Sequence, residues 1–209
     1  MPKISVIMIH PDTEIRFISE EKGYGVVATK LIPKGTITWV QDDLDQIFTR
    51  DQIIKLNPFI KKCLDIYSFT NKNGDMVLCW DNGKFVNHSF KPSCFSTPYD
   101  FEIAVRDIYP GEELTDDYGY LNVEKPFHVI DEGTVRKTVY PDDILNFYEE
   151  WDNLIKENAP KVLEVKQSLT ELIPEKTWNE FVNAVHNPEQ MKSILECHYQ
   201  HGIQVKNAS

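Results

Sequence analysis

Short apolar runs separated by turn residues fill the first 125 residues of the chain. Their β-branched side chains, and the Gly and Pro residues between them, predict strands of about five residues each. The last run, residues 101–106, alternates apolar and polar side chains as a half-buried strand does. The predicted strands cover residues 4–9, 15–18, 25–29, 36–40, 76–80 and 101–106.

One helical segment interrupts these strands. Thr49 is a suitable N-cap residue for it, and Pro58 predicts a kink or a break within it. Apolar side chains recur in this segment at helical spacing, at Ile53, Leu56, Ile60, Leu64 and Tyr67.

After residue 140 the apolar pattern becomes helical. Pro141 suits the first turn of an amphipathic helix over residues 141–157, which Pro160 is expected to end. Further helices are predicted over residues 162–172, 178–185 and 191–199. We therefore predict an α+β protein, mainly β, with a β-rich domain over residues 1–125 and a small helical region over residues 126–209.

Composition and charge narrow the classes of function. The chain has 209 residues, of which 41% are hydrophobic, which suits one folded domain with a small appendage rather than a disordered chain. Its 22 basic and 33 acidic residues give a formal net charge of −11. Binding to nucleic acid or to an anionic membrane normally needs a basic face, so neither is expected. An acidic protein attracts basic partners, although acidity also serves solubility alone.

The cysteines and the N-terminal residues indicate whether the protein binds metal and where in the cell it is found. The 4 cysteines form no C-x-x-C pair and no zinc-ligand rhythm, so we expect free thiols, no metal site and a reducing cytoplasm. The apolar run over residues 4–9 is too short for a signal peptide or a membrane span. Secretion, or nuclear targeting in a host, stays open.

Three separated stretches have a pattern typical of binding or catalytic sites. The first is the Gly23-Tyr24-Gly25 turn, which lacks the third glycine of a Rossmann fingerprint. The second is Asn87-His88-Ser89-Phe90-Lys91-Pro92, and the third runs from Gly111 to Gly119 as Gly-Glu-Glu-Leu-Thr-Asp-Asp-Tyr-Gly. Taken alone, the turn could be an ordinary one, His88 a core histidine and Tyr118 a packed aromatic. Taken together and in this order, over about residues 14–122, they resemble the SET-domain protein lysine methyltransferases.

The resemblance implies a fold and a cofactor. The SET fold consists of several small β-sheets, with the Asn-His-Ser segment and the Asp-Tyr segment crossing in a C-terminal pseudoknot. The implied cofactor is S-adenosyl-L-methionine. The matching motifs assign its binding to Lys22, Gly23, Tyr24, Gly25, Asn87 and His88. Tyr67 matches a family tyrosine more weakly, and it also fits as the last apolar contact of its helix.

The resemblance also implies an activity, transfer of a methyl group to a lysine of a basic protein. Tyr118 matches the catalytic tyrosine, while His88 and Asp117 would hold the crossing segments together. Histone, histone-like and ribosomal proteins are all candidate substrates, and the oligomeric state stays open. The alternatives are a catalytically degenerate SET module that binds a partner or cofactor without turnover, and methylation of a small amine or a non-histone protein.

The sequence departs from the family pattern at several positions. Asp116 stands where an aromatic residue often helps to set how many methyl groups are added, and Ser93 replaces a frequent asparagine. Gln41 takes an aromatic position, with Trp39 nearby as a substitute. The cysteine-rich zinc segment that closes the lysine channel in many members is missing, as in small stand-alone bacterial SET proteins. Phe127 or Tyr140 could cover the site instead, or could be core residues.

Overall fold

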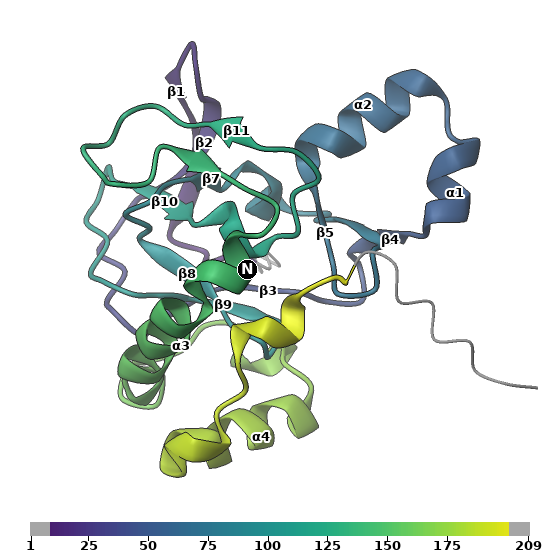
Figure 1. Ribbon diagram of the computed structural model, residues 1–209. Helices are drawn as coiled ribbons and strands as arrows, with labels where there is room; N and C mark the ends of the chain where they lie inside the picture. Colours follow the sequence, from purple (N-terminus) through teal and green to yellow (C-terminus); the bar gives the residue numbers. More distant parts are fainter. Residues whose placement is uncertain (1–8, 201–209) are drawn as a thin grey trace, which may run out of the picture.

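The computed structural model describes residues 9–200 and arranges them as several small sheets with helices on two sides (Figure 1). The largest sheet has four strands, in which β1, β2 and β10 are antiparallel and β7 joins β10 in parallel. In sheet order these strands are β1 (Thr13–Ser19), β2 (Gly23–Ala28), β10 (Glu113–Asp116) and β7 (Asn87–His88).

The remaining sheets are small and antiparallel. One has the order β3 (Ile37–Val40), β9 (Phe101–Ala104) and β8 (Cys94–Ser96). A second has the order β4 (Gln46–Phe48), β6 (Met76–Leu78) and β5 (Ser68–Thr70). The last is the pair β11 (Phe127–His128) and β12 (Thr138–Val139).

The α-helices form two groups that lie on different sides of the sheets (Figure 1). The first group is α1 (Arg50–Lys55) and α2 (Pro58–Tyr67), and the second is α3 (Asp143–Val162) and α4 (Glu175–His186). Short 3-10 turns complete the chain: η1 (Asn82–Phe85), η2 (Tyr118–Tyr120), η3 (Thr170–Leu172), η4 (Pro188–Gln190) and η5 (Ile194–Cys197). The α+β class is confirmed, but helices contain more residues than strands, so "mainly β" was wrong.

The capping chemistry of the first helical segment follows the sequence. The Thr49 hydroxyl accepts a bond from the Gln52 N–H, and the Gln52 side chain accepts one from the Thr49 N–H at 2.8 Å, which makes a capping box. Pro58 does break the segment, because α1 ends at Lys55 and α2 begins at Pro58 with Asn57 as its cap. Strands lie at five of the six predicted positions, and residues 4–8 of the remaining one lie outside the described residues.

Several local predictions were wrong. The strand β9 is not half-buried, because all four of its residues are buried between neighbouring elements. Pro160 does not end α3 but lies in its last turn, where the missing N–H removes a single helical bond. Residues 163–169 form no helix, because the Gln167 side chain bonds to Gly35 O and to the Ile37 N–H, at 2.9 and 2.8 Å.

Residues 191–199 contain only the short turn η5 and not the predicted helix. Several of their backbone N–H groups donate to side chains of other elements and not to carbonyl groups one helical turn earlier. The Lys192 N–H donates to the Tyr99 hydroxyl at 3.1 Å, and the Ile194 N–H donates to the Asp152 carboxylate at 2.7 Å. Tertiary contacts therefore override the helical apolar pattern here.

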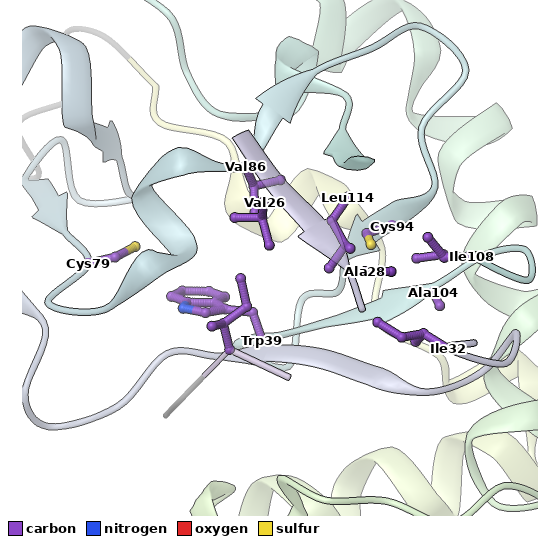
Figure 2. Packing of buried hydrophobic residues seen from close by; sticks show 11 residues of the cluster. Val26, Ala28, Ile32, Trp39, Cys79, Val86, Cys94, Ala104, Ile108 and Leu114 are labelled. Atoms are coloured by element: carbon purple, nitrogen blue, oxygen red, sulfur yellow. The ribbon is translucent and has the colours of Figure 1, made fainter. Parts of the chain in front are cut away.

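The buried side chains form three clusters. The first lies between β2, β3, β9 and β10 and includes Trp39, Val86 and Leu114 (Figure 2). The second packs Ile37 and Phe101 against Phe181 and Ala184 of α4. The third packs Phe95 of β8 and Tyr120 against the α3 residues Ile144, Trp151 and Ile155. The C-terminal helices therefore share their core with the sheets, and the expected division at residue 125 stays a prediction.

Candidate active site

The second and third sequence motifs meet at the parallel pairing of β7 with β10. Asn87 pairs with Thr115, and His88 pairs with Asp116. The Ser89 N–H extends the contact by donating to Asp116 O at 3.0 Å. Ser93, at the frequent asparagine position, is fully buried, and its hydroxyl accepts a bond from the Thr115 N–H at 2.9 Å. The fold thus brings together segments that are separated by more than twenty residues in the sequence.

Tyr118 begins the turn η2 immediately after this junction. Its backbone N–H donates to His88 Nδ1 at 3.0 Å, and its hydroxyl donates a short hydrogen bond to Val86 O. Burial raises the pKa of the phenol far above its ordinary value, and the nearby Asp116 and Glu102 carboxyl groups raise it further. Tyr118 therefore carries a neutral hydroxyl whose direction is fixed by two contacts.

His88 is a neutral, buried imidazole. Burial lowers its pKa to about 3, and the charges of Arg136 and Lys22 add to the effect. Because Nδ1 accepts from Tyr118, the ring proton is on Nε2, which has no hydrogen-bond partner among the described residues. The Asp117 carboxylate lies 3.9 Å from Nδ1, but the two groups form no ion pair because the His88 ring is neutral. The contacts fit a residue that orients Tyr118 rather than one that transfers protons.

Asp117 is held by Arg136, a residue that the sequence patterns did not single out. The Arg136 guanidinium donates to the buried carboxylates of both Asp117 and Asp143, the second at 2.5 Å. It also lies over the rings of Phe90 and Phe147, 4.5 Å from each centroid. Arg136 therefore ties the third motif to α3, and a lone arginine in a loop gives no sequence signal of this role.

The first motif packs against Asn87 and Glu113. Gly23 has a φ of +74°, which favours glycine, whereas a Cβ on Gly25 would lie only 2.9 Å from Asn87 Nδ2. The Asn87 amide donates to Tyr24 O at 3.1 Å and to Glu113 Oε1 at 2.7 Å. Lys22 Nζ bonds to the other Glu113 oxygen at 3.1 Å. The predicted cofactor residues of both motifs are thus side by side, with Glu113 of the third motif as a partner to which no role was assigned.

Tyr118 lines a cavity of about 1150 Å³. Tyr67, at the end of α2, lines this cavity, and its ring also packs edge-on against Phe85 with centroids 5.6 Å apart. Trp39, Gln41 and Phe127 line the cavity too, whereas Tyr140 does not. The predicted residues Lys22, Gly23, Tyr24, Gly25, Asn87 and His88 lie outside its wall. Val86, which accepts the Tyr118 hydroxyl, is itself part of the wall and directly precedes Asn87.

Comparison with known families decides the identity of this arrangement. Residues 23–119 match the family model of the SET domain. The chain therefore contains a SET domain. The matched stretch contains all three motifs and lies within the predicted span of residues 14–122. SET domains are generally protein lysine methyltransferases that use S-adenosylmethionine. No curated protein is similar to the chain.

Two acidic side chains of the SET domain line the same cavity as Tyr118. Glu102 on β9 and Asp116 on β10 are both buried, with exposures of 4% and 5%. Thr38 donates its hydroxyl to Glu102 at 2.6 Å, and Tyr120 donates a short hydrogen bond to Asp116. Burial raises the pKa of Glu102 to about 7 and that of Asp116 well above its ordinary value. The sequence marked Asp116 only as a departure from the family, and Glu102 not at all.

Membrane helices, metal ligands and cysteines can be described for residues 9–200. No helix in this range is both long and apolar enough to cross a membrane. The same range contains no group of three or more His, Cys, Asp or Glu side chains placed to hold a metal ion. Its cysteines, Cys63, Cys79, Cys94 and Cys197, are free thiols.

Proposed function

We propose that this protein is an S-adenosylmethionine-dependent protein lysine N-methyltransferase that acts on a basic protein. The observation that carries the proposal is the position of Tyr118. Its hydroxyl is neutral and is oriented by Val86 O, and the residue both lines a large cavity and bonds through its backbone to His88, one of the residues expected to bind the cofactor. That position is where an amine entering from the cavity would meet a methyl donor held by the Gly23–Gly25 turn.

The residues present fit S-adenosylmethionine. Gly23 and Gly25 have no Cβ, which lets other groups come close to the backbone of the turn, and the Lys22 ammonium beside it is paired with Glu113. The buried Nε2–H of His88 is a donor that lacks a partner among the described residues, as expected beside a bound polar group. Lys22, Gly23, Tyr24, Gly25, Asn87 and His88 would therefore hold the cofactor. Tyr67 lines the cavity instead. It would contact the cofactor only where the cavity meets the region of these cofactor-binding residues.

The bound cofactor supplies a methyl group on a cationic sulfur. The chain positions the acceptor, because the walls of the cavity confine a lysine side chain and the Tyr118 oxygen accepts weak C–H or N–H contacts. The aromatic rings of Trp39, Tyr67 and Phe127 are part of the cavity wall. Apolar surroundings and the cationic sulfur of the bound cofactor would both favour the neutral amine, which is the nucleophilic form of lysine.

The proposed substrate is basic because the protein is acidic. The net charge of −11 favours approach of cationic segments such as those of histone, histone-like or ribosomal proteins. The same charge disfavours direct contact with nucleic acid and with anionic membranes. A cytoplasmic location is consistent with the free thiols and is part of this proposal.

A degenerate SET module that binds without turnover is the second candidate. Asp116 at the usual aromatic position favours this alternative, because it changes the wall of the lysine channel. The intact Tyr118, Asn87 and His88 favour the enzyme.

Two measurements on the purified protein test the proposal. Calorimetry with S-adenosylmethionine should give binding in the micromolar range, about −8 kcal/mol. Incubation with methyl-labelled cofactor and a panel of basic proteins should then label lysine residues. Cofactor binding without any labelling would favour the degenerate module, and no binding at millimolar cofactor would exclude the enzyme and leave only a module that binds a partner.

A further inference from the structure

Glu102 and Asp116 form a buried pair of acids without a cation. Their carboxyl groups lie within hydrogen-bonding reach of each other, on adjacent parts of the cavity wall. Over residues 9–200, no Lys or Arg side chain forms an ion pair with either of them. Arg136, which binds Asp117 next to Asp116 in the sequence, forms its ion pairs with Asp117 and Asp143 instead.

The surroundings of the pair can accept one negative charge but hardly two. Polar hydrogens reach the pair from Thr38, Ser96 and Tyr120, and the Cys94 thiol also faces Glu102. The titratable groups that act on the pair, Asp81, Asp117, Tyr118 and Tyr120, provide no positive charge. The same cavity wall also contains Arg50, Lys72, Lys84 and Lys125, but none of them forms an ion pair with either acid. Two carboxylates so close in a buried site cannot both ionise, so the pair shares one proton near neutral pH. A single buried anion remains, and its natural partner is a cation that enters from the cavity.

Resting on the proposed function, we propose that Glu102 and Asp116 are the receptor for the substrate's lysine ammonium group and that they select ammonium groups that carry N–H bonds. Both acids line the cavity that contains Tyr118, so an ammonium bound to them lies in the region where the amine must be positioned. The acids are positioning residues in this account, and Tyr118 remains the catalytic one.

The pair also provides a place for the lysine proton. The ammonium transfers one proton to the anionic pair, so that the nitrogen keeps its electron pair and both carboxyl groups become neutral acids. The proton returns to solvent through the open cavity before the next turnover. The loss of charge from the pair and from the lysine in one step avoids leaving a lone charge in the buried site.

A selectivity follows from the hydrogen bonds. Carboxyl oxygens accept N–H donors, and an unmethylated or monomethylated ammonium has several to offer. A trimethylated ammonium has none and leaves the carboxylate unpaired. The pair should therefore favour lysines with few methyl groups, in contrast to an aromatic wall, which accepts a quaternary ammonium readily.

The test compares two small cations as lysine mimics, n-butylammonium and n-butyltrimethylammonium. Their binding to the full-length protein is followed by NMR chemical-shift changes at pH 8, without cofactor. The wild-type protein should bind n-butylammonium more tightly, and Glu102→Gln and Asp116→Asn should each weaken it by about tenfold. Both substitutions keep the side-chain shape, and binding of the trimethyl compound should change little.

Asp45→Asn is the matched control. Asp45 is another partly buried acid with a raised pKa, but it does not line the cavity, so its removal should leave both affinities unchanged. Lowering the pH to 6 should weaken n-butylammonium binding to the wild type, because the pair becomes fully protonated, and should not affect the two cavity variants. Thermal unfolding of each variant verifies that it is folded.

The outcomes separate this inference from the proposed function. Equal binding of both cations by the wild type, or unchanged binding by folded Glu102→Gln and Asp116→Asn, would overturn the inference even if the protein methylates lysine. If the protein binds n-butylammonium selectively through Glu102 and Asp116 but methylates nothing, the result would support the ammonium-binding role of the pair and contradict the proposed methyltransferase activity.

Discussion

The backbone N–H of Tyr118 donates a hydrogen bond to Nδ1 of His88, 3.0 Å away. This bond joins the Asn-His-Ser segment to the Asp-Tyr segment across the parallel strands β7 and β10. It requires a neutral imidazole, because protonation at Nδ1 would remove the acceptor. The orientation of Tyr118, the proposed catalytic residue, is therefore linked to the protonation state of a buried histidine.

Stability at low pH should depend on His88. Its pKa is about 3 in the folded protein and 6.5 as a reference value, so the fold favours the neutral form. The stabilisation is complete above pH 6.5 and is lost as the pH falls towards 3, at a cost of about 3 kcal/mol by pH 4. Denaturant unfolding should show this slope in the wild type. In His88→Gln, which keeps an acceptor but does not titrate, the pH dependence between 4 and 7 should be smaller by that amount. Equal slopes would show that His88 is not the buried group responsible.

Removing the Arg136 side chain should destabilise the protein strongly. Arg136→Met leaves the buried carboxylates of Asp117 and Asp143 without their cation, which typically costs about 3–5 kcal/mol. Arg106→Met is the matched control, because Arg106 forms an exposed pair with Glu112 that should contribute less than about 1 kcal/mol. The free energies of unfolding, measured in urea, compare the two. A loss of similar size in both variants would contradict the role given to Arg136.

A methyl group on Gly25 should disturb both the fold and cofactor binding. The added Cβ would lie 2.4 Å from Glu113 Oε1 and 2.8 Å from Ile18 Cγ1, so neighbouring side chains must move. We expect Gly25→Ala to cost about 1–3 kcal/mol of stability and to weaken S-adenosylmethionine binding in calorimetry. Gly133→Ala is the control. Gly133 has a φ of +69° but lies in open space, so the added methyl group costs only backbone strain, about 1–2 kcal/mol, and should leave cofactor affinity unchanged. Normal cofactor affinity in Gly25→Ala would remove the turn from the binding site.

The fold could be predicted from the sequence where local chemistry decides it. The Thr49 capping box and the break at Pro58 act within a few residues, and the structure has both. The segments at 163–169 and 191–199 have apolar spacing that suits helices. In the first, the Gln167 side chain bonds to the backbone of Gly35 and Ile37, and in the second, Tyr99 and Asp152 accept bonds from backbone N–H groups. Such long-range partners leave no periodic signal in the sequence.

The site was predictable where a motif contains its residues. Tyr118, His88 and Asn87 occur in recognisable motifs, and the fold brings these motifs together. Glu102 occurs in an ordinary strand and Arg136 in an ordinary loop, and each gains its role only from the residues that fold against it. The division of the predicted residues between the turn and the cavity likewise depends on the tertiary fold.

The most direct test of the central claim is the methylation rate of Tyr118→Phe together with its cofactor affinity. The substitution removes the hydroxyl that bonds to Val86 O and keeps the ring packing against His88. Turnover on a basic protein substrate should fall by about 10² or more, while S-adenosylmethionine affinity in calorimetry stays near that of the wild type. A Tyr118→Phe protein that binds the cofactor and methylates at the wild-type rate would contradict the assignment of Tyr118 as the catalytic residue.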